Sequence, residues 1–457
     1  MEFISATDLQ FNSRPVMEAW LGNNLIWGRG VIWTGLGLDN NWSNTSNWYK
    51  GKVPPTFSSI QFTGTTRLST YNDFSVDRPV NDITFNASSG SFQLSGNRFI
   101  LSTGGITNNS VNAQTIDNDI KLSSEETYIN CNTGDITFNG LLSGSGSIVK
   151  TGNSKANVSV ARTVSTGSVT VSAGTLKFDN LTTNGGADLA NLTPSVFNLN
   201  GDGTTLIFNS AAGRVRARQT TYNFSSFGNQ TINYLGGTYF NNGSTFITNG
   251  GPKNYINGGI IEGQTASVFY NVADGTDDVD LEIGSILNRQ GPTKTGNGKL
   301  SIVSSITNIT GQITISNGIF DIGGTCILQN IIYTIANDAT FSYSSSNNSN
   351  CSLYTISGTG NLIKSGTSSL TLSSAKCTYT GTTSILNGSI VTTKNTATAT
   401  FTPTTLTINF STPPNIGDTF RFFSGSTIQS YASVSLIGAP ARTASYNSTI
   451  STLTIDS

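Results

Sequence analysis

The sequence predicts an all-β protein whose main body is a β-solenoid, that is, a chain wound into stacked coils of short strands. Aromatic and β-branched residues recur in short runs bounded by Gly and Asn, as in Ser59–Phe62, Asp82–Phe85 and Phe99–Leu101. No stretch of about 12 residues repeats its apolar positions every 3.6 residues, as an amphipathic helix would. One arrangement of Lys and Gly also recurs at fixed spacing, which is typical of repeat folds.

The composition is that of a folded but weakly charged chain. Only 11% of the 457 residues are charged and the net charge is −1, whereas ordinary soluble domains are about 25% charged. Such a chain offers no electrostatic footprint for nucleic acid or an anionic membrane. It has no apolar run of about 18 residues, and its start lacks a basic segment followed by an apolar stretch. We therefore expect no nucleic-acid partner, no membrane insertion and no export signal.

The sequence contains no histidine, which narrows the chemistry it supports. Histidine is the commonest general base and the commonest metal ligand. The four cysteines, Cys131, Cys326, Cys351 and Cys377, form no CxxC pair, and we interpret them as small buried thiols. We expect no catalytic residue, no metal site and no cofactor.

The first residues differ from the rest of the chain. Residues 1–30 contain both Met residues and the stretch Ala19–Trp27, which predicts a short β-hairpin turning at Gly22-Asn23-Asn24. Residues 31–57 place Trp33, Trp42 and Trp48 between turn-forming residues. Because Trp is costly to leave exposed, these residues predict a Trp-rich cap at the end of a larger core.

The remaining chain divides into two expected parts, a β-solenoid body over residues 58–400 and a C-terminal β domain over residues 401–457. The body contains three copies of one register, which begin at Lys150, Lys294 and Lys364. In each copy Gly follows the lysine at +2, +17 and +24, and an apolar residue follows at +26. Gly supplies the positive φ that sharp corners need, and coils of about 20–25 residues are typical of solenoids.

These copies resemble the autotransporter-associated β-strand repeat, also called the passenger-associated transport repeat. The third copy fits best, at Cys377–Ile385. The resemblance implies a β-solenoid shaft and carries over no catalytic residue. Proteins of this kind also need a signal peptide and a translocating barrel, and we identify neither in the sequence.

The stretch Ala19–Trp27 resembles instead a short N-terminal segment of some bacteriophage appendage proteins. This resemblance implies that residues 1–30 bind other virion structural proteins. Within them, the apolar side chains expected to make the attachment are Trp20, Leu21, Leu25, Ile26 and Trp27. A virion protein assembled inside the host needs no export signal, and its cysteines remain reduced there.

Three other segments are candidate contact sites. Arg214, Arg216 and Arg218 alternate along the chain, so a strand places them on one face, either as a contact for anionic glycan or as a solvated outer face. The acidic segment Asp274–Glu282 offers oxygen ligands for Ca²⁺, or is an exposed turn. Aromatic pairs such as Tyr222 and Phe224 either stack on sugars or fill the core.

The function that the sequence favours is a bacteriophage virion structural protein, such as a tail fibre, a spike or a head fibre or decoration protein. It would display the β-solenoid and contact host-surface glycan, and it would locate to the virion. A secreted adhesin or autotransporter-type passenger at the bacterial cell surface is one alternative, and a glycan depolymerase tailspike is the other. The sequence leaves open whether the protein forms a homotrimer, in the virion or at the bacterial cell surface.

Overall fold

The structure is a computed structural model, and most of the chain from residue 31 onward is described. Before residue 31 only the backbone of short segments is described. The described residues are 10–11, 14–15, 18–21, 24–28, 31–102, 104–123, 126–159, 167–179, 190–191, 195–210, 214–217, 219–263, 265–324, 331–347, 349–351, 355–373, 377–381, 383–393, 405–409, 415–417, 419–421, 433–437, 442–447 and 452–456.

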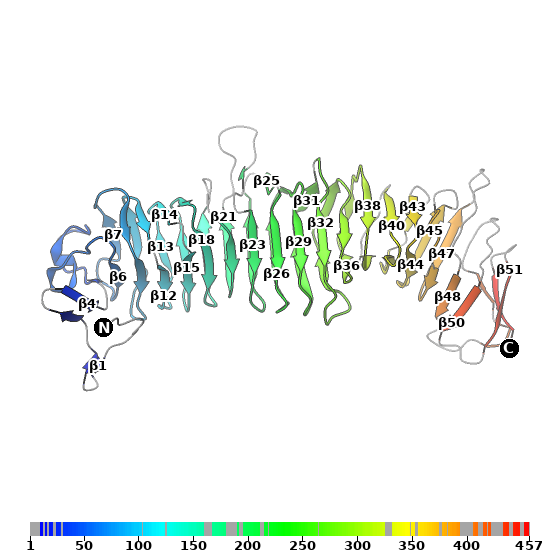
Figure 1. The fold of residues 1–457 in the computed structure, drawn as a ribbon, viewed down its shortest axis with the longest axis horizontal. Coiled ribbons are helices and arrows are strands. Elements are labelled where there is room, and N and C mark those ends of the chain that lie inside the picture. Colours follow the sequence, from blue (N-terminus) through cyan, green and yellow to red (C-terminus); the bar gives the residue numbers. More distant parts are fainter. Residues whose placement is uncertain are drawn as a thin grey trace. The chain divides into compact units, whose positions relative to one another are not determined.

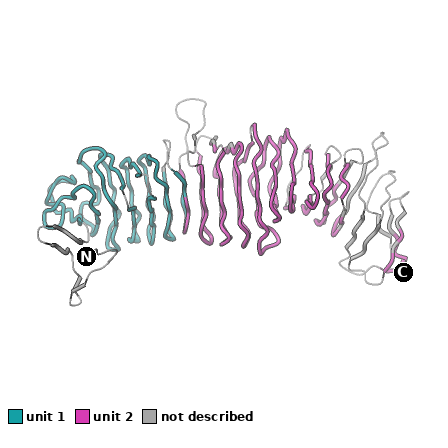
Figure 2. The backbone as a smooth tube through the Cα atoms, viewed as in Figure 1, with its two compact units in different colours: residues 1–169, 174–176 teal, residues 170–173, 177–457 magenta. Residues whose placement is uncertain are grey.

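The chain forms two compact units (Figure 2). Unit 1 comprises residues 1–169 and 174–176, and unit 2 comprises residues 170–173 and 177–457. The boundary between the units falls within two strands, β20 (Val169–Val171) and β21 (Thr175–Asp179). Both units are parallel β-solenoids, which confirms the predicted all-β solenoid body.

In unit 1 the chain winds through three parallel ladders in turn (Figure 1). The first ladder is β5 (Val31–Trp33), β6 (Ser59–Phe62), β9 (Asp82–Phe85), β12 (Gly105–Asn108), β15 (Glu126–Cys131) and β18 (Ser147–Thr151). The second is β7 (Ser69–Asn72), β10 (Gln93–Gly96), β13 (Gln114–Ile116), β16 (Ile136–Phe138) and β19 (Lys155–Ser159). The third is β8 (Arg78–Val80), β11 (Phe99–Leu101), β14 (Ile120–Leu122) and β17 (Leu142–Gly144).

The interior of unit 1 is built from columns of apolar side chains. Ile60 pairs with Ile83, Ile83 with Ile106 and Ile106 with Ile129, and each pair differs by 23 in residue number. All four side chains are buried. Since strand side chains alternate between two faces, residues on either side of each Ile point outward. Each coil thus buries its inner face against the coils before and after it.

A buried aromatic cluster lies at the first coil of unit 1. Trp33, Trp42 and Trp48 are at most 2% exposed, and the ring centroids of Trp33 and Trp48 are 5.1 Å apart, edge to face. The Trp42 ring also packs on Phe62, at 5.9 Å. Buried Asn47 donates to the main-chain oxygens of Asp39 and Asn41 at 3.0 Å, which holds this loop around the indoles. The loop contains two 3₁₀ turns, η1 (Thr45–Asn47) and η2 (Tyr49–Gly51).

The N-terminal hairpin is also present in the described backbone. β3 (Glu18–Leu21) and β4 (Asn24–Gly28) pair antiparallel, with Trp20 opposite Leu25. They form a two-stranded sheet of their own and join none of the described parallel ladders. β1 (Gln10–Phe11) and β2 (Arg14–Pro15) form a second short antiparallel pair.

Unit 2 repeats the arrangement of parallel ladders. Its first ladder is β23 (Val196–Leu199), β26 (Thr221–Phe224), β29 (Thr245–Thr248), β32 (Phe269–Val272), β35 (Thr293–Thr295), β38 (Gln312–Ile315), β40 (Ile332–Ile335) and β43 (Thr355–Gly358). Its second is β24 (Thr205–Asn209), β27 (Thr231–Leu235), β30 (Asn254–Asn257), β33 (Leu281–Ile283), β36 (Lys299–Ile302), β39 (Ile319–Ile322), β41 (Thr340–Tyr343), β44 (Asn361–Lys364), β46 (Thr383–Ile385), β48 (Thr405–Asn409) and β50 (Ser433–Ile437).

The third side of the unit 2 coil carries two shorter sheets. One is β22 (Ala190–Asn191), β25 (Arg214–Arg216), β28 (Thr238–Phe240), β31 (Ile260–Gly263), β34 (Ile286–Arg289) and β37 (Ile306–Thr307). The other is β42 (Ser349–Cys351), β45 (Ser369–Ser373) and β47 (Ser389–Thr393).

An aromatic stack runs along the first ladder of unit 2. Phe197, Tyr222, Phe246 and Tyr270 are paired in sequence, and their successive ring centroids are 5.4, 4.6 and 5.3 Å apart with nearly parallel planes. Here paired residues differ by 24 or 25 in number, and at Ile313 and Tyr333 they differ by 20. Across the described pairs of unit 2 the difference ranges from 19, at Leu281 and Leu300, to 28, at Thr405 and Ser433, so most coils but not all have the predicted length of about 20–25 residues.

Parallel pairing continues past residue 400 through β48 and β50. A separate antiparallel sheet follows near the C-terminus. It consists of β49 (Thr419–Arg421), β52 (Thr452–Ile455) and β51 (Ala444–Asn447), in that spatial order.

Candidate functional site

The repeated lysines are buried at coil corners. Lys150, Lys294 and Lys364 are each 0% exposed, although lysine is almost never fully buried unless it is paired. Each occupies an inward position, where its partner in the preceding strand is Ile129, Tyr270 or Tyr343.

Main-chain carbonyl groups surround each buried ammonium. Lys294 Nζ donates to the oxygens of Thr295 at 2.8 Å, Gly296 at 2.7 Å and, one coil later, Asn317 at 3.2 Å. Lys150 Nζ donates to Thr151 at 2.7 Å and Gly152 at 2.8 Å. Lys364 Nζ donates to the oxygens of Gly366 and Asn387. The lysine thus satisfies carbonyl oxygens at a corner, and Lys294 and Lys364 also contact the next coil.

The glycine at +24 packs against the main-chain oxygen of the glycine at +2. Gly318 has a φ of +65°, and a Cβ atom there would lie 2.5 Å from the Gly296 oxygen and 2.6 Å from that of Gly298. Gly174 has the same φ, with a Cβ position 2.7 Å from the Gly152 oxygen. Only glycine fits such a conformation with the neighbouring coil so close. The +2 carbonyl therefore lies between the lysine ammonium and the +24 glycine.

Burial lowers the pKa of these lysines. It lowers the pKa of Lys294 and that of Lys364 to about 8, and it also lowers the pKa of Lys150. Lys294 lies on the first ladder of unit 2 and Lys364 on the second. The lysine–carbonyl contact therefore accompanies the repeat motif wherever it occurs and is not restricted to one ladder. The motif that we noted in the sequence is a corner-stabilising element.

The arginine segment lies on the third side of the unit 2 coil. Arg214 and Arg216 are the end residues of β25, and Val215 between them is buried. β25 pairs with β28, with Val215 opposite Tyr239. For Arg214 and Arg216 the backbone alone is described, and Arg218 lies outside the described residues. Contact with an anionic glycan stays a prediction.

Carboxylate groups of the acidic segment bind lysine side chains and main-chain N–H groups. Lys299 Nζ binds Asp278 at 2.8 Å and Lys253 Nζ binds Glu282 at 2.9 Å. Asp280 is buried and accepts from the main-chain N–H groups of Gly275 at 2.7 Å and Lys299 at 2.6 Å. Lys253 and Lys299 come from neighbouring coils, so the segment joins successive corners. Among the described residues, no three His, Cys, Asp or Glu side chains are grouped to hold a metal ion.

Several other candidates belong to the core. Tyr222, Phe224 and Tyr239 are buried, as the core interpretation predicts. Cys131 and Cys377 are also buried, whereas Cys326 lies outside the described residues and only the backbone of Cys351 is described. Burial raises the pKa of Cys131 to about 11, which makes the thiol unreactive.

The predicted attachment residues lie in the N-terminal hairpin, where the backbone alone is described. Trp20 and Leu21 are in β3, and Leu25, Ile26 and Trp27 are in β4. The structure brings them together in one two-stranded sheet.

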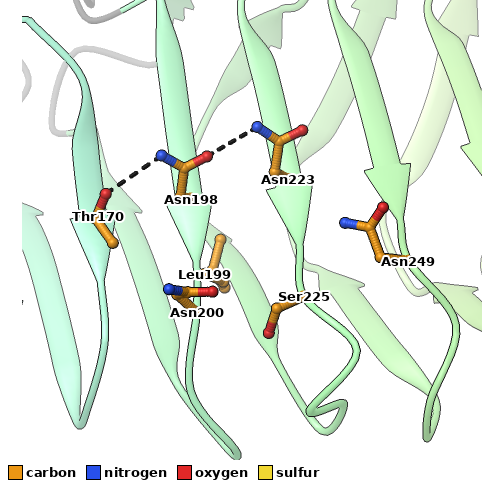
Figure 3. Close-up of a pocket in the computed structure, with 7 residues that line it drawn as sticks. All are labelled: Thr170, Asn198, Leu199, Asn200, Asn223, Ser225 and Asn249. Atoms are coloured by element: carbon orange, nitrogen blue, oxygen red, sulfur yellow. Dashed lines mark hydrogen bonds between the residues drawn. The ribbon is translucent and has the colours of Figure 1, made fainter.

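A polar groove in unit 2 was not identified from the sequence (Figure 3). It is open to solvent, has a volume of about 310 Å³ and lies on the outer face of the first ladder. Asn198 Nδ2 donates to Thr170 Oγ1 at 3.2 Å, and Asn223 Nδ2 donates to Asn198 Oδ1 at 2.8 Å. The lining residues are Thr170, Asn198, Leu199, Asn200, Asn223, Ser225 and Asn249. The groove has no charged lining residue.

Comparison with known proteins gives no assignment, because no family model, no curated protein and no solved structure matches this chain. The repeat and N-terminal resemblances therefore stay predictions. Within the described residues, no helix has the length and apolar character needed to cross a bilayer.

Proposed function

We propose that this protein is a structural component of a bacteriophage virion, a fibre, spike or decoration protein that displays a β-solenoid. Residues 1–30 attach it to other virion proteins, and the outer faces of the coils contact host-surface glycan. The proposal includes no catalytic step and no cofactor.

The N-terminal hairpin is the observation that carries this proposal. β3 and β4 pair with each other and with no other described strand, so the hairpin is an addition to the solenoid and not one of its coils. Its sequence, Trp20-Leu21 and Leu25-Ile26-Trp27, is rich in side chains that anchor protein interfaces. An added apolar hairpin before a solenoid suits attachment at one end and display along the rest.

The interior supports a role in display over one in chemistry. The lysine and glycine residues that repeat are engaged in holding corners, and the acidic segment is paired with Lys253 and Lys299. Many copies on one particle would then give avidity from weak individual contacts.

Removal of residues 1–30 tests the proposal. The shortened protein should keep the circular dichroism spectrum of a β-solenoid and should be absent from purified particles grown with the variant gene. A matched control replaces exposed Leu38 by Ala, which leaves the hairpin intact. Incorporation of the shortened protein at the normal level would refute the attachment role.

The two alternative functions predict different results. A secreted adhesin or passenger would be found at the bacterial surface and not in particles. A depolymerase tailspike would release reducing ends from host polysaccharide, and such release would overturn the non-enzymatic part of the proposal.

A further inference from the structure

We propose that the asparagine-lined groove of unit 2 binds an uncharged saccharide. This inference deepens the proposed function, because it names the surface and the ligand class with which a displayed solenoid would recognise a host. It does not depend on where in the virion the protein sits.

The hydrogen-bonding capacity of the groove is only partly used. The chain of bonds from Asn223 through Asn198 to Thr170 stops at Asn223, because the next residue in that column is Ile247. Within the described residues, Asn223 Oδ1 therefore has no hydrogen-bond partner, and neither has the amide of exposed Asn200. Asn249 donates to the Phe224 oxygen at 2.8 Å, and its own Oδ1 stays open to solvent. These amides offer both donors and acceptors, as sugar hydroxyl groups require.

The neighbouring strands supply an apolar surface on the same face. Ile247 on β29 is in register with Asn223 and points outward, because Phe246 and Thr248 beside it are buried. Phe269 on β32 is 40% exposed and pairs with Thr245, so it lies diagonally next to Ile247. Phe269 lies two strands from Asn223 and outside the groove lining, so the amides are able to bind the hydroxyl groups of one sugar while the ring stacks on the C–H face of a neighbouring sugar.

The geometry of the sheet favours a chain of sugar units over a single small molecule. Adjacent strands are about 4.8 Å apart, which is close to the length of one sugar ring. The rigid ladder thus repeats its amides at a spacing that successive sugars match. The groove is open to solvent, which suits a segment of a long polymer.

The absence of charge from the lining sets the ligand class. Thr170, Asn198, Asn200, Asn223, Ser225 and Asn249 do not titrate near neutral pH. An anionic ligand would find no positively charged side chain in this lining, whereas a neutral saccharide needs none. Binding at this groove should therefore change little with salt or with pH between about 5 and 9.

The test uses the full chain and a panel of immobilised hexasaccharides. Maltohexaose, cellohexaose and chitohexaose are the neutral probes, and a heparin hexasaccharide is the anionic probe. We expect at least one neutral probe to bind, and we expect Asn223→Ala and Asn200→Ala each to weaken binding roughly tenfold. Asn200 is exposed and without a side-chain bond in the described residues, so its replacement leaves the fold unaffected.

The control is Asn233→Ala. Asn233 is a half-buried, outward-facing residue of β27, on the second ladder of the same unit, and its replacement should not change binding. No binding of any neutral probe, or equal loss in the Asn233 control, would overturn the inference. Binding of the heparin probe alone, weakened by salt, would also overturn it and would point to the arginine strand β25.

The outcome is separate from that of the virion experiment. Saccharide binding by a protein that is absent from particles would refute the proposed function and keep the groove. Incorporation into particles without neutral-saccharide binding would refute saccharide binding at the groove and keep the proposed virion function.

Discussion

The ammonium group of Lys294 donates to the main-chain oxygen of Gly296 at 2.7 Å, while a Cβ atom on Gly318 would lie 2.5 Å from that same oxygen. One carbonyl group thus links two coils, because the lysine binds it and the glycine leaves room for it. This contact explains why lysine and two glycines keep one spacing in three copies.

Replacing Lys294 by Met should change how stability depends on pH. Burial lowers the pKa of Lys294 to about 8 from 10.5, so between these pH values the unfolded chain holds more protons than the folded one. The free energy of unfolding should therefore rise as pH increases from about 8, by up to roughly 3 kcal/mol for this residue. Chemical denaturation at several pH values checks this.

Lys294→Met should lose that rise, and Lys155→Met is the control. Lys155 is about half exposed in an ion pair with Asp135, so Lys155→Met is a matched loss of one positive charge at a solvent-accessible position. An unchanged slope in Lys294→Met would contradict the prediction.

Gly318→Ala should destabilise unit 2 more than Gly203→Ala does. Both glycines have positive φ, +65° and +62°, so alanine costs about 1 kcal/mol at either position. A Cβ at Gly318 also meets the carbonyl groups of the previous coil, whereas nothing lies within 4 Å of one at Gly203. Denaturation midpoints of the two variants measure the difference, and equal midpoints would rule out the close approach.

Trp42→Ala should strongly destabilise unit 1. The indole is fully buried, packs on Phe62 and donates to Thr70 Oγ1 at 3.0 Å. Removing a buried Trp costs about 3–5 kcal/mol. Leu38, which is 96% exposed, is the control, and Leu38→Ala should have no effect. Thermal unfolding followed by Trp fluorescence reports both, and a shift in the Leu38 variant alone would be the opposite of what we expect.

Two buried tyrosines should respond differently to the loss of their hydroxyl groups. Tyr239 OH is 2.8 Å from the oxygens of Phe208 and Leu235, so Tyr239→Phe should cost about 1–2 kcal/mol. Tyr270 OH is buried without a partner among the described residues, so Tyr270→Phe should be neutral or stabilising. Chemical denaturation compares them, and the reverse order would show that Tyr270 has an acceptor.

Cys131 should resist alkylation in the folded protein. It is buried and its pKa is raised to about 11, so little thiolate forms near pH 8. Iodoacetamide labelling followed by peptide mass mapping should find Cys131 unmodified before denaturant is added and modified afterwards. Rapid labelling of the native protein would mean that this coil opens readily.

The fold was predictable from the sequence because the strands alternate. In Ser59–Phe62, Ile60 and Phe62 point inward and their neighbours outward, as the apolar pattern predicts. The role of the lysines was not predictable, because lysine is normally an exposed residue. Its fixed distance from glycines at +2 and +24 was the signal, and only the structure reveals that these atoms meet.

Contacts between coils were not predictable from the sequence because they depend on which residues of neighbouring strands are paired. Asp278 binds Lys299, 21 positions later, so the acidic segment looked local in the sequence although its partners belong to other coils. Likewise Asn198 and Asn223 are 25 positions apart and meet because β23 and β26 pair. In a chain so rich in Asn, composition does not single them out.

In the described strands the coils vary from 19 to 29 residues between paired positions, yet the buried columns stay aligned. The corners must therefore absorb the difference. A genetic insertion or deletion of one residue at a corner alters the outline of one coil, whereas the same change within a strand would turn its buried side chains outward. The length of a corner can therefore change while the buried columns of side chains stay the same.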